Sequence, residues 1–202
     1  MDNTRLTGLR VAILWVAFCG AVVADDAVGQ MSPAGRAELV LRLLPAQARP
    51  DATVLLRDGE HEERYREGTG RFLCVSDASS PTRLSMVCHH HVLEQRLRFE
   101  RELRAGTGLR GGAYRERLCS EVSSRGWEVP DGAMEITASL GKNEDGRYAH
   151  EMTVYHLLWL PNQTEETVGV IDKDPGDDRP WLHQAGTCGA HVMWSDVIAV
   201  SQ

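Results

Sequence analysis

The chain has 202 residues and a formal net charge of −7 at neutral pH. This length fits one domain with a hydrophobic core of its own. The acidic balance argues against nucleic acid as a partner, because binding to a phosphate backbone relies on a surplus of basic side chains. Nearly all the basic residues are Arg, with Lys142 and Lys173 as the exceptions, which indicates a GC-rich bacterial genome.

The N-terminus, residues 1–24, has the pattern of a cleavable secretory signal peptide. Arg5 and Arg10 precede an apolar run that ends in small residues at Ala24. The run is shorter than the roughly 20 residues that a membrane-spanning helix needs. We therefore predict cleavage after Ala24 and export to the periplasm or the medium. The mature protein is expected to be soluble and not membrane-spanning, with a flexible stretch over 25–31.

A helix is predicted over 33–44. Ser32 is suited to cap its free N–H groups, and Pro33 suits the first helical turn. Apolar residues then recur at spacings of three and four until Pro45, which ends the helix.

Between 52 and 88 the apolar period shifts toward two, which is typical of strands. The segments 53–57, 62–66, 70–76 and 84–88 predict a four-stranded antiparallel meander. Because its second strand is almost wholly charged, we expect that strand to lie exposed at an edge.

The rest of the chain predicts further helices and strands. Helices are expected over 91–104 and 113–123, a hairpin over 133–140 and 151–160, a long loop over 161–189 and a short strand over 191–194. The fold class is therefore α+β: a single domain over 32–202, mainly antiparallel sheet with two or three helices.

Four cysteines remain after cleavage, an even number that favours disulfides in an exported protein. Cys74 and Cys88 lie on two predicted neighbouring strands, so we favour a Cys74–Cys88 bridge, with Cys119–Cys188 as the second pair. No CxxC motif suggests thiol exchange.

Cys88 is followed by three consecutive histidines, and thiolate and imidazole are ligands that zinc and copper prefer. Since alternate residues of a strand share a face, Cys88 and His90 are placed to converge with a distant ligand such as His191. Other candidate ligands are Cys74, Glu94 and His183. The spacing matches no recognised metal signature, so an oxidised Cys88 is the favoured interpretation and no cofactor is expected.

Two further patterns favour structural roles. Cys188 lies three residues before His191, but a cysteine nucleophile would have to stay reduced outside the cell, so a bridge to Cys119 is preferred. The acidic segment 172–178 lacks the ligand spacing of a calcium loop, which favours a solvated turn.

Several local motifs together carry a resemblance. They are Pro180-Trp181-Leu182, Gly186, Ala190-His191-Val192-Met193, Phe72-Leu73-Cys74-Val75 and Val87-Cys88. With these motifs the chain resembles uncharacterised exported proteins from bacteria. The resemblance implies one domain and brings no assigned activity.

No serine-hydrolase elbow, phosphate-binding glycine loop or dinucleotide fingerprint occurs, so no catalytic residue is assigned. The first hypothesis is an exported, non-catalytic module that binds a small ligand or an envelope protein, with a pocket formed by Trp159, Trp181 and His191. The alternative is a metal-binding protein or metal-dependent hydrolase that uses the cluster from Cys88 to His91 together with His191.

Overall fold

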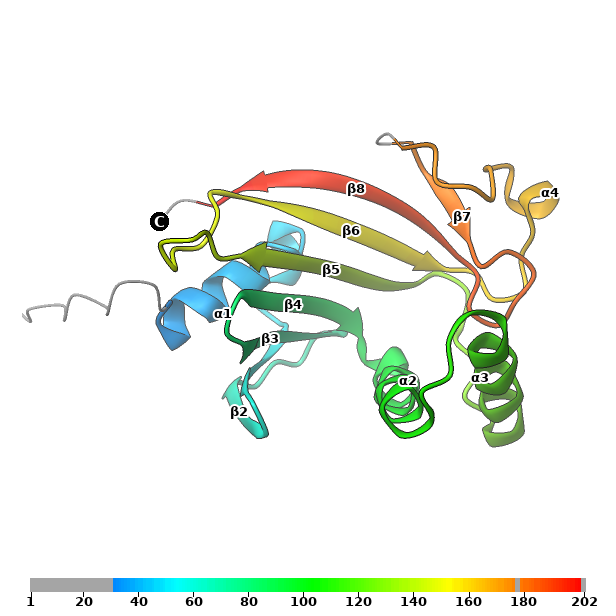
Figure 1. Cartoon of the computed structure of the whole chain (residues 1–202), viewed down its shortest axis with the longest axis horizontal. Coiled ribbons are helices and arrows are strands. Elements are labelled where there is room, and N and C mark those ends of the chain that lie inside the picture. The colour runs from blue at the N-terminus through cyan, green and yellow to red at the C-terminus, as the bar shows by residue number, and fades with distance from the viewer. Residues whose placement is uncertain (1–30, 177–178, 201–202) are drawn as a thin grey trace, which may run out of the picture.

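The computed structural model describes residues 31–176 and 179–200 (Figure 1). The predicted signal peptide and its cleavage site lie outside the described residues, as does most of the predicted flexible stretch. Within the described ranges, no helix has the length and apolar character needed to cross a membrane.

Helices and strands follow the predicted order. The helices are α1 (Pro33–Leu41), α2 (Glu94–Thr107), α3 (Gly111–Arg125) and the single turn α4 (Glu165–Val168). The strands are β1 (Thr53–Asp58), β2 (His61–Arg66), β3 (Phe72–Ser80), β4 (Arg83–His90), β5 (Ala133–Gly141), β6 (Glu151–Trp159), β7 (Trp181–His183) and β8 (His191–Ala199). Over the described residues these strands form one sheet in the order β2-β1-β3-β4-β5-β6-β8-β7, so the predicted α+β class is confirmed.

The predicted meander is wrong in one connection, because β1 and β3 pair in parallel. β2 runs antiparallel to β1 and ends beside the start of β1, where Val54 pairs with Arg66. The chain then crosses the start of β1 so closely that a Cβ on Gly68 would lie 2.3 Å from the carbonyl oxygen of Asp51. Glycine is therefore required at this crossing, which delivers β3 to the other side of β1.

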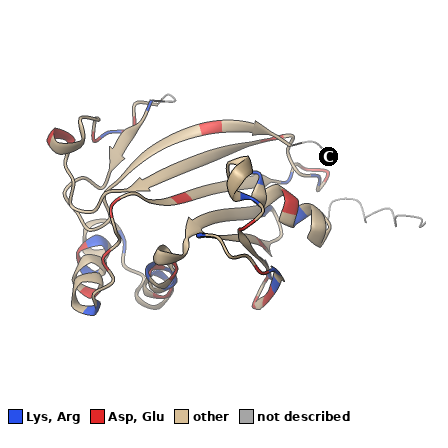
Figure 2. Ribbon diagram, turned by 180° about the vertical axis from the view of Figure 1, so that it is seen from behind, with Lys and Arg blue, Asp and Glu red and all other residues tan. Residues whose placement is uncertain are grey.

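Strand β2 lies at one edge of the sheet and is exposed along most of its length, as predicted. Charged residues are frequent on β2 and on the helices, whereas the central strands carry few (Figure 2). Charges on an edge strand oppose pairing with a strand of another molecule.

Helix α1 begins as predicted, because the Ser32 side chain accepts a hydrogen bond of 3.1 Å from the backbone N–H of Gly35. The helix ends at Leu41, earlier than predicted, and the chain continues in a turn to Pro45. Buried Arg36 holds α1 on the sheet by donating to the Asp58 carboxylate and to the carbonyl of Ser76.

The sheet has two differently covered faces. One face packs against α1 and forms the main core, called here the α1 face; it includes Val54, Cys74, Met86, Cys88, Ile136 and Val154. Because side chains alternate along strands, the neighbouring residues point to the opposite face, called here the α2 face. The α2 face includes Leu55, Leu73, Val75, Val87, His89, Glu135 and Trp159.

Helices α2 and α3 lie together at one end of the sheet (Figure 1). Both run longer than predicted at their C-termini and end at Gly108 and Gly126, which adopt the left-handed conformation. Between them they form a small apolar cluster that includes Leu103, Tyr114, Leu118 and Val122 and is separate from the main core.

The C-terminal part contains more structure than predicted. The hairpin of β5 and β6 is confirmed, but the predicted loop 161–189 contains α4 and β7. The predicted short strand 191–194 continues to Ala199, which pairs with Glu151 at the far end of β6. The sequence did not predict this extension because the charged residue Asp196 interrupts the apolar pattern. In the structure the Asp196 carboxylate lies 3.0 Å from Nε2 of His156 on the neighbouring strand β6.

Candidate ligand-binding site

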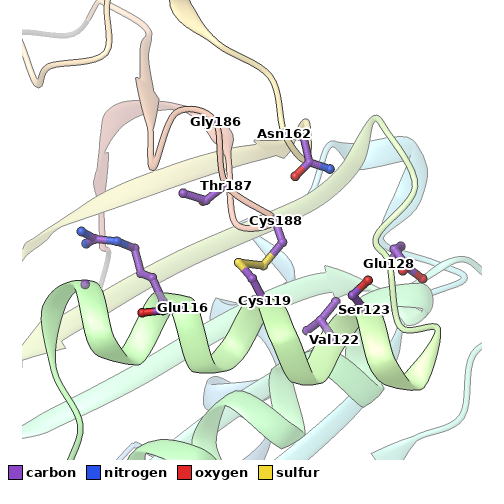
Figure 3. A pocket seen from close by; sticks show the side chains of 11 residues that line it. Glu116, Cys119, Val122, Ser123, Glu128, Asn162, Gly186, Thr187 and Cys188 are labelled. Carbon is purple, nitrogen blue, oxygen red and sulfur yellow. A yellow bond between two sulfur atoms is a disulfide. The ribbon is translucent and has the colours of Figure 1, made fainter.

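The four cysteines within the described residues form the two disulfides that the sequence favours. Cys74 and Cys88 are opposite each other on β3 and β4, fully buried under α1. Cys119 and Cys188 join α3 to the segment that precedes β8 (Figure 3). Because both are oxidised, Cys88 cannot act as a thiolate ligand for a metal, and Cys188 cannot act as a cysteine nucleophile.

The residues of the alternative zinc or copper site, Cys88, His90 and His191, are not brought together. Cys88 and His90 point to the α1 face, where the His90 ring packs against Phe72 and its Nδ1 accepts from the N–H of Met134. His191 lies on the opposite face, in register with Trp159. Among the residues that the structure describes, no three His, Cys, Asp or Glu side chains gather in a metal-binding group.

The three residues of the predicted pocket are all buried. The rings of Trp159 and His191 are in contact, with centroids 5.1 Å apart. Trp181 lies on the edge strand β7, where it pairs with Met193 of β8. None of them lines the cavities described below. The cavities instead lie around α2 and α3.

A buried arginine ties α2 to the sheet and to the second disulfide. Arg96, 1% exposed, donates to Glu100 at 2.9 Å and to the carbonyl of Cys188 at 2.8 Å. Its guanidinium also lies 4.5 Å from the ring centroid of Trp159. A buried cation needs such partners, because desolvation would otherwise make it costly.

The main candidate site is a cavity of about 480 Å³ between α2 and the sheet, called here the α2-face cavity. Its apolar part is formed by Leu55, Leu73, Val75 and Val87. Its polar lining consists of His89 and Ser85 from β4, three basic residues and three acidic residues: Arg57, Arg98, Arg101, Glu62, Asp77 and Glu94. Cavities of this size that combine apolar walls with a few polar groups are typical of small-molecule sites.

His89 supplies the most informative polar group of this cavity. It is 3% exposed, yet neither ring nitrogen has a hydrogen-bond partner among the described residues. Burial, aided by the charge of Arg101, lowers the pKa of His89 to about 4, so the ring is neutral at pH 7. A neutral imidazole without partners offers one donor and one acceptor to a ligand.

Arg101 supplies the available charge. Arg57 is paired with Glu62 and Asp77, and Arg98 is paired with Glu94. Arg101 makes no hydrogen bond or ion pair with the described part of the chain. Partial burial, followed by the charges of Arg57 and Arg98, lowers the pKa of Arg101, while the charges of Glu62 and Glu102 act in the opposite direction.

A partly buried carboxyl lies beside His89, because Glu135 is its register partner on β5. Burial, and secondly the charge of Glu100, raise the pKa of Glu135 from 4.5 to about 7. The folded protein therefore binds this proton more tightly than the unfolded chain does.

Glu135→Gln should consequently change the pH dependence of stability. The stabilisation that comes from the Glu135 proton is complete below about pH 4.5 and is lost as the pH rises through about 7. Relative to wild type, the variant should therefore become more stable between about pH 4.5 and pH 8. Urea unfolding across this range measures the difference.

His89 and His191, whose pKa values burial lowers to about 4, have the opposite effect, since they cost stability as the pH falls below 6.5. They are unchanged in the Glu135→Gln variant, so the difference between the two proteins isolates the carboxyl. Parallel pH profiles for variant and wild type would refute the assignment.

A second cavity, of about 580 Å³, opens beside the Cys119–Cys188 bridge (Figure 3). Ser123 and Glu128 approach it from the α3 side, and Asn162 and Thr187 from the C-terminal segments. No buried polar group without a partner points to a ligand there, so the α2-face cavity is the stronger candidate.

Comparison of the chain with protein-family models, with curated proteins and with solved structures finds no match.

Sequence reasoning missed His89, Arg101 and Glu135. The signal for His89 was present, because Val87 and His89 must share a face opposite Cys88 if the segment is a strand. The partners on α2 had no such signal, since they approach the sheet only through tertiary packing.

Proposed function

We propose that this protein is an exported module that binds a small organic anion with an apolar body in the α2-face cavity. The observation that carries the proposal is buried His89, whose two ring nitrogens lack partners within the described residues and which lies beside the apolar part of the cavity.

The apolar part of the cavity favours a hydrocarbon or aromatic ligand body. Leu55, Leu73 and Val75 form one apolar cluster with Val87 at the wall of the cavity. Covering apolar surface contributes roughly 25 cal/mol per Å² removed from water. A ligand body seated here gains this term without displacing the main core, which lies on the other face of the sheet.

The polar groups favour an anion. His89 offers a hydrogen bond at the wall, and Arg101 offers a guanidinium that makes no ion pair within the described residues. Hydrogen bonds to charged groups contribute roughly 1.5–3 kcal/mol each, which is enough to select a carboxylate over an ammonium ligand.

Export is supported by the signal-peptide pattern of residues 1–24 and by the two disulfides. Structural disulfides persist in oxidising compartments and are rare in the cytosol. The destination that we propose is the periplasm or the medium.

Isothermal titration with decanoate tests the proposal, with decylamine as a probe of equal chain length and opposite charge. We expect decanoate to bind with a 1:1 stoichiometry and decylamine to bind at least tenfold more weakly. His89→Phe, which keeps an aromatic ring but removes both nitrogens, and Arg101→Gln should each weaken decanoate binding about tenfold.

Arg147→Gln is the matched control, because Arg147 is equally charged and exposed, lies in the connection between β5 and β6, and does not line the cavity. Its affinity for decanoate should stay within twofold of wild type. Equal affinity for decanoate and decylamine, or unchanged binding in both cavity variants, would overturn the proposal.

A further inference from the structure

A third cavity, of about 650 Å³, lies where α2 turns into α3 and is called here the corner cavity. Four arginines line it: Arg101, Arg104, Arg110 and Arg115. No acidic side chain is part of this lining, although acidic residues outnumber basic ones in the whole chain, 29 to 22. The corner cavity is therefore a cationic site on an acidic protein.

The guanidinium groups retain most of their hydrogen-bonding capacity. Within the described ranges, Arg101 and Arg115 make no hydrogen bond or ion pair, and Arg110 donates only to the carbonyl of its neighbour Leu109. Each can therefore present a pair of N–H donors to an oxyanion.

One of the four arginines is held in place by the helix pair itself. Arg104 Nε donates to the hydroxyl of Tyr114 at 3.1 Å, and its guanidinium lies 4.9 Å from the centroid of the Tyr114 ring. Tyr114 is buried between α2 and α3, so the position of Arg104 is fixed by the core of the helix pair. A preorganised donor loses less conformational entropy on binding.

The start of α3 adds to the positive field. Its first residue, Gly111, lines the cavity, no side chain caps the helix, and no acidic residue occupies the first turn. The N–H groups of a helix start carry partial positive charge. In keeping with this field, burial and then the charge of Arg115 lower the pKa of nearby His183.

The lining also includes Ala105, Leu109 and Tyr114, and the cavity is far larger than a single inorganic oxyanion requires. We propose that the corner cavity binds a small organic molecule that carries a dianionic tetrahedral group, such as a phosphate monoester. The four arginines take the oxyanion and the apolar residues take the organic body. This site shares Arg101 with the one in the proposed function, but Arg110 and Arg115 line only the corner cavity and not the α2-face cavity.

Isothermal titration of the full mature protein with phenyl phosphate, at low ionic strength and about pH 7.5, tests this inference. We expect 1:1 binding that weakens as salt is added, because the attraction is electrostatic. The double variant Arg110→Gln/Arg115→Gln should lose at least tenfold in affinity, since it removes two charged donors. Both side chains are exposed, so the variant should fold normally.

The matched control is Arg83→Gln/Arg147→Gln, which makes the same change in net charge at exposed arginines outside the cavity. Its affinity for phenyl phosphate should stay within twofold of wild type. If both double variants lost the same affinity for phenyl phosphate, net charge alone would explain the loss and the assignment would be overturned. Unchanged affinity in the Arg110→Gln/Arg115→Gln variant would also overturn it.

Two further titrations define the ligand class. Benzoate, a monoanion with the same ring, should bind at least tenfold more weakly than phenyl phosphate. Inorganic phosphate should also bind more weakly, because it lacks the organic body. If inorganic phosphate binds as tightly as phenyl phosphate, the organic-ligand part of the inference is refuted. Decanoate binding in the Arg110→Gln/Arg115→Gln variant should be unchanged, which keeps this test distinct from that of the α2-face cavity.

Discussion

Arg96→Met should lower the free energy of unfolding by about 3–5 kcal/mol, the usual cost of removing one partner from a buried charge network. Methionine fills much of the same volume but cannot donate to Glu100 or to the carbonyl of Cys188. The Glu100 carboxylate, whose side chain is 14% exposed, then loses its partner, and the contact with the Trp159 ring is lost as well. Urea unfolding followed by circular dichroism measures the change.

Arg98→Met is the matched control, because it lies on the same helix, pairs with Glu94 at the same spacing and has a side chain that is 64% exposed. Exposed ion pairs contribute at most about 1 kcal/mol, so this variant should stay within that range. Similar losses for the two variants would mean that Arg96 does not connect α2 to the sheet in the way its contacts indicate.

In the double variant Cys119→Ala/Cys188→Ala, helix α3 should unfold locally at a lower free energy than the rest of the molecule. The bridge spans 69 residues, and the entropy of closing a loop of that length corresponds to about 4 kcal/mol. Because α2 and α3 form their own apolar cluster, apart from the main core, loss of the bridge should expose them to local opening. Hydrogen exchange read by mass spectrometry should show faster exchange over 111–125 and unchanged exchange over β3 to β5.

Cys74→Ala/Cys88→Ala is the comparison variant. That bridge spans only 14 residues, corresponding to about 3 kcal/mol, but it lies in the main core under α1. Its loss should speed exchange in the sheet and α1 together. If the two double variants gave the same exchange pattern, α3 would not be a separately stabilised element.

Local signals in the sequence predict local structure well in this chain. Ser32 and Pro33 mark the start of α1, and period-two patterns locate the strands. The Cys74–Cys88 pairing followed from placing two short apolar runs on neighbouring strands. The parallel pairing of β1 with β3 could not be predicted in the same way, because it depends on where the chain crosses after β2, and Gly68 alone does not reveal the backbone of Asp51 beneath it.

The candidate site was less predictable than the fold because it is made by tertiary contact. The histidine cluster drew attention to Cys88 and His90, whereas the strand places His89 alone on the face that α2 covers. Arg96 and Arg101 lie on the same charged helix, α2. Their different exposure, Arg96 buried and Arg101 exposed, results from tertiary packing and cannot be predicted from the helix sequence. The sequence predicts Trp159 as a pocket residue, but in the structure the guanidinium of Arg96 covers its ring.

A methyl NMR titration with decanoate can both detect the ligand and locate it in the protein. Binding in the α2-face cavity should change the chemical shifts of the methyl groups of Leu55, Leu73, Val75 and Val87, and should leave Val154 in the core on the α1 face unchanged. Shifts absent from these four residues, or spread evenly over both faces of the sheet, would contradict binding in the α2-face cavity.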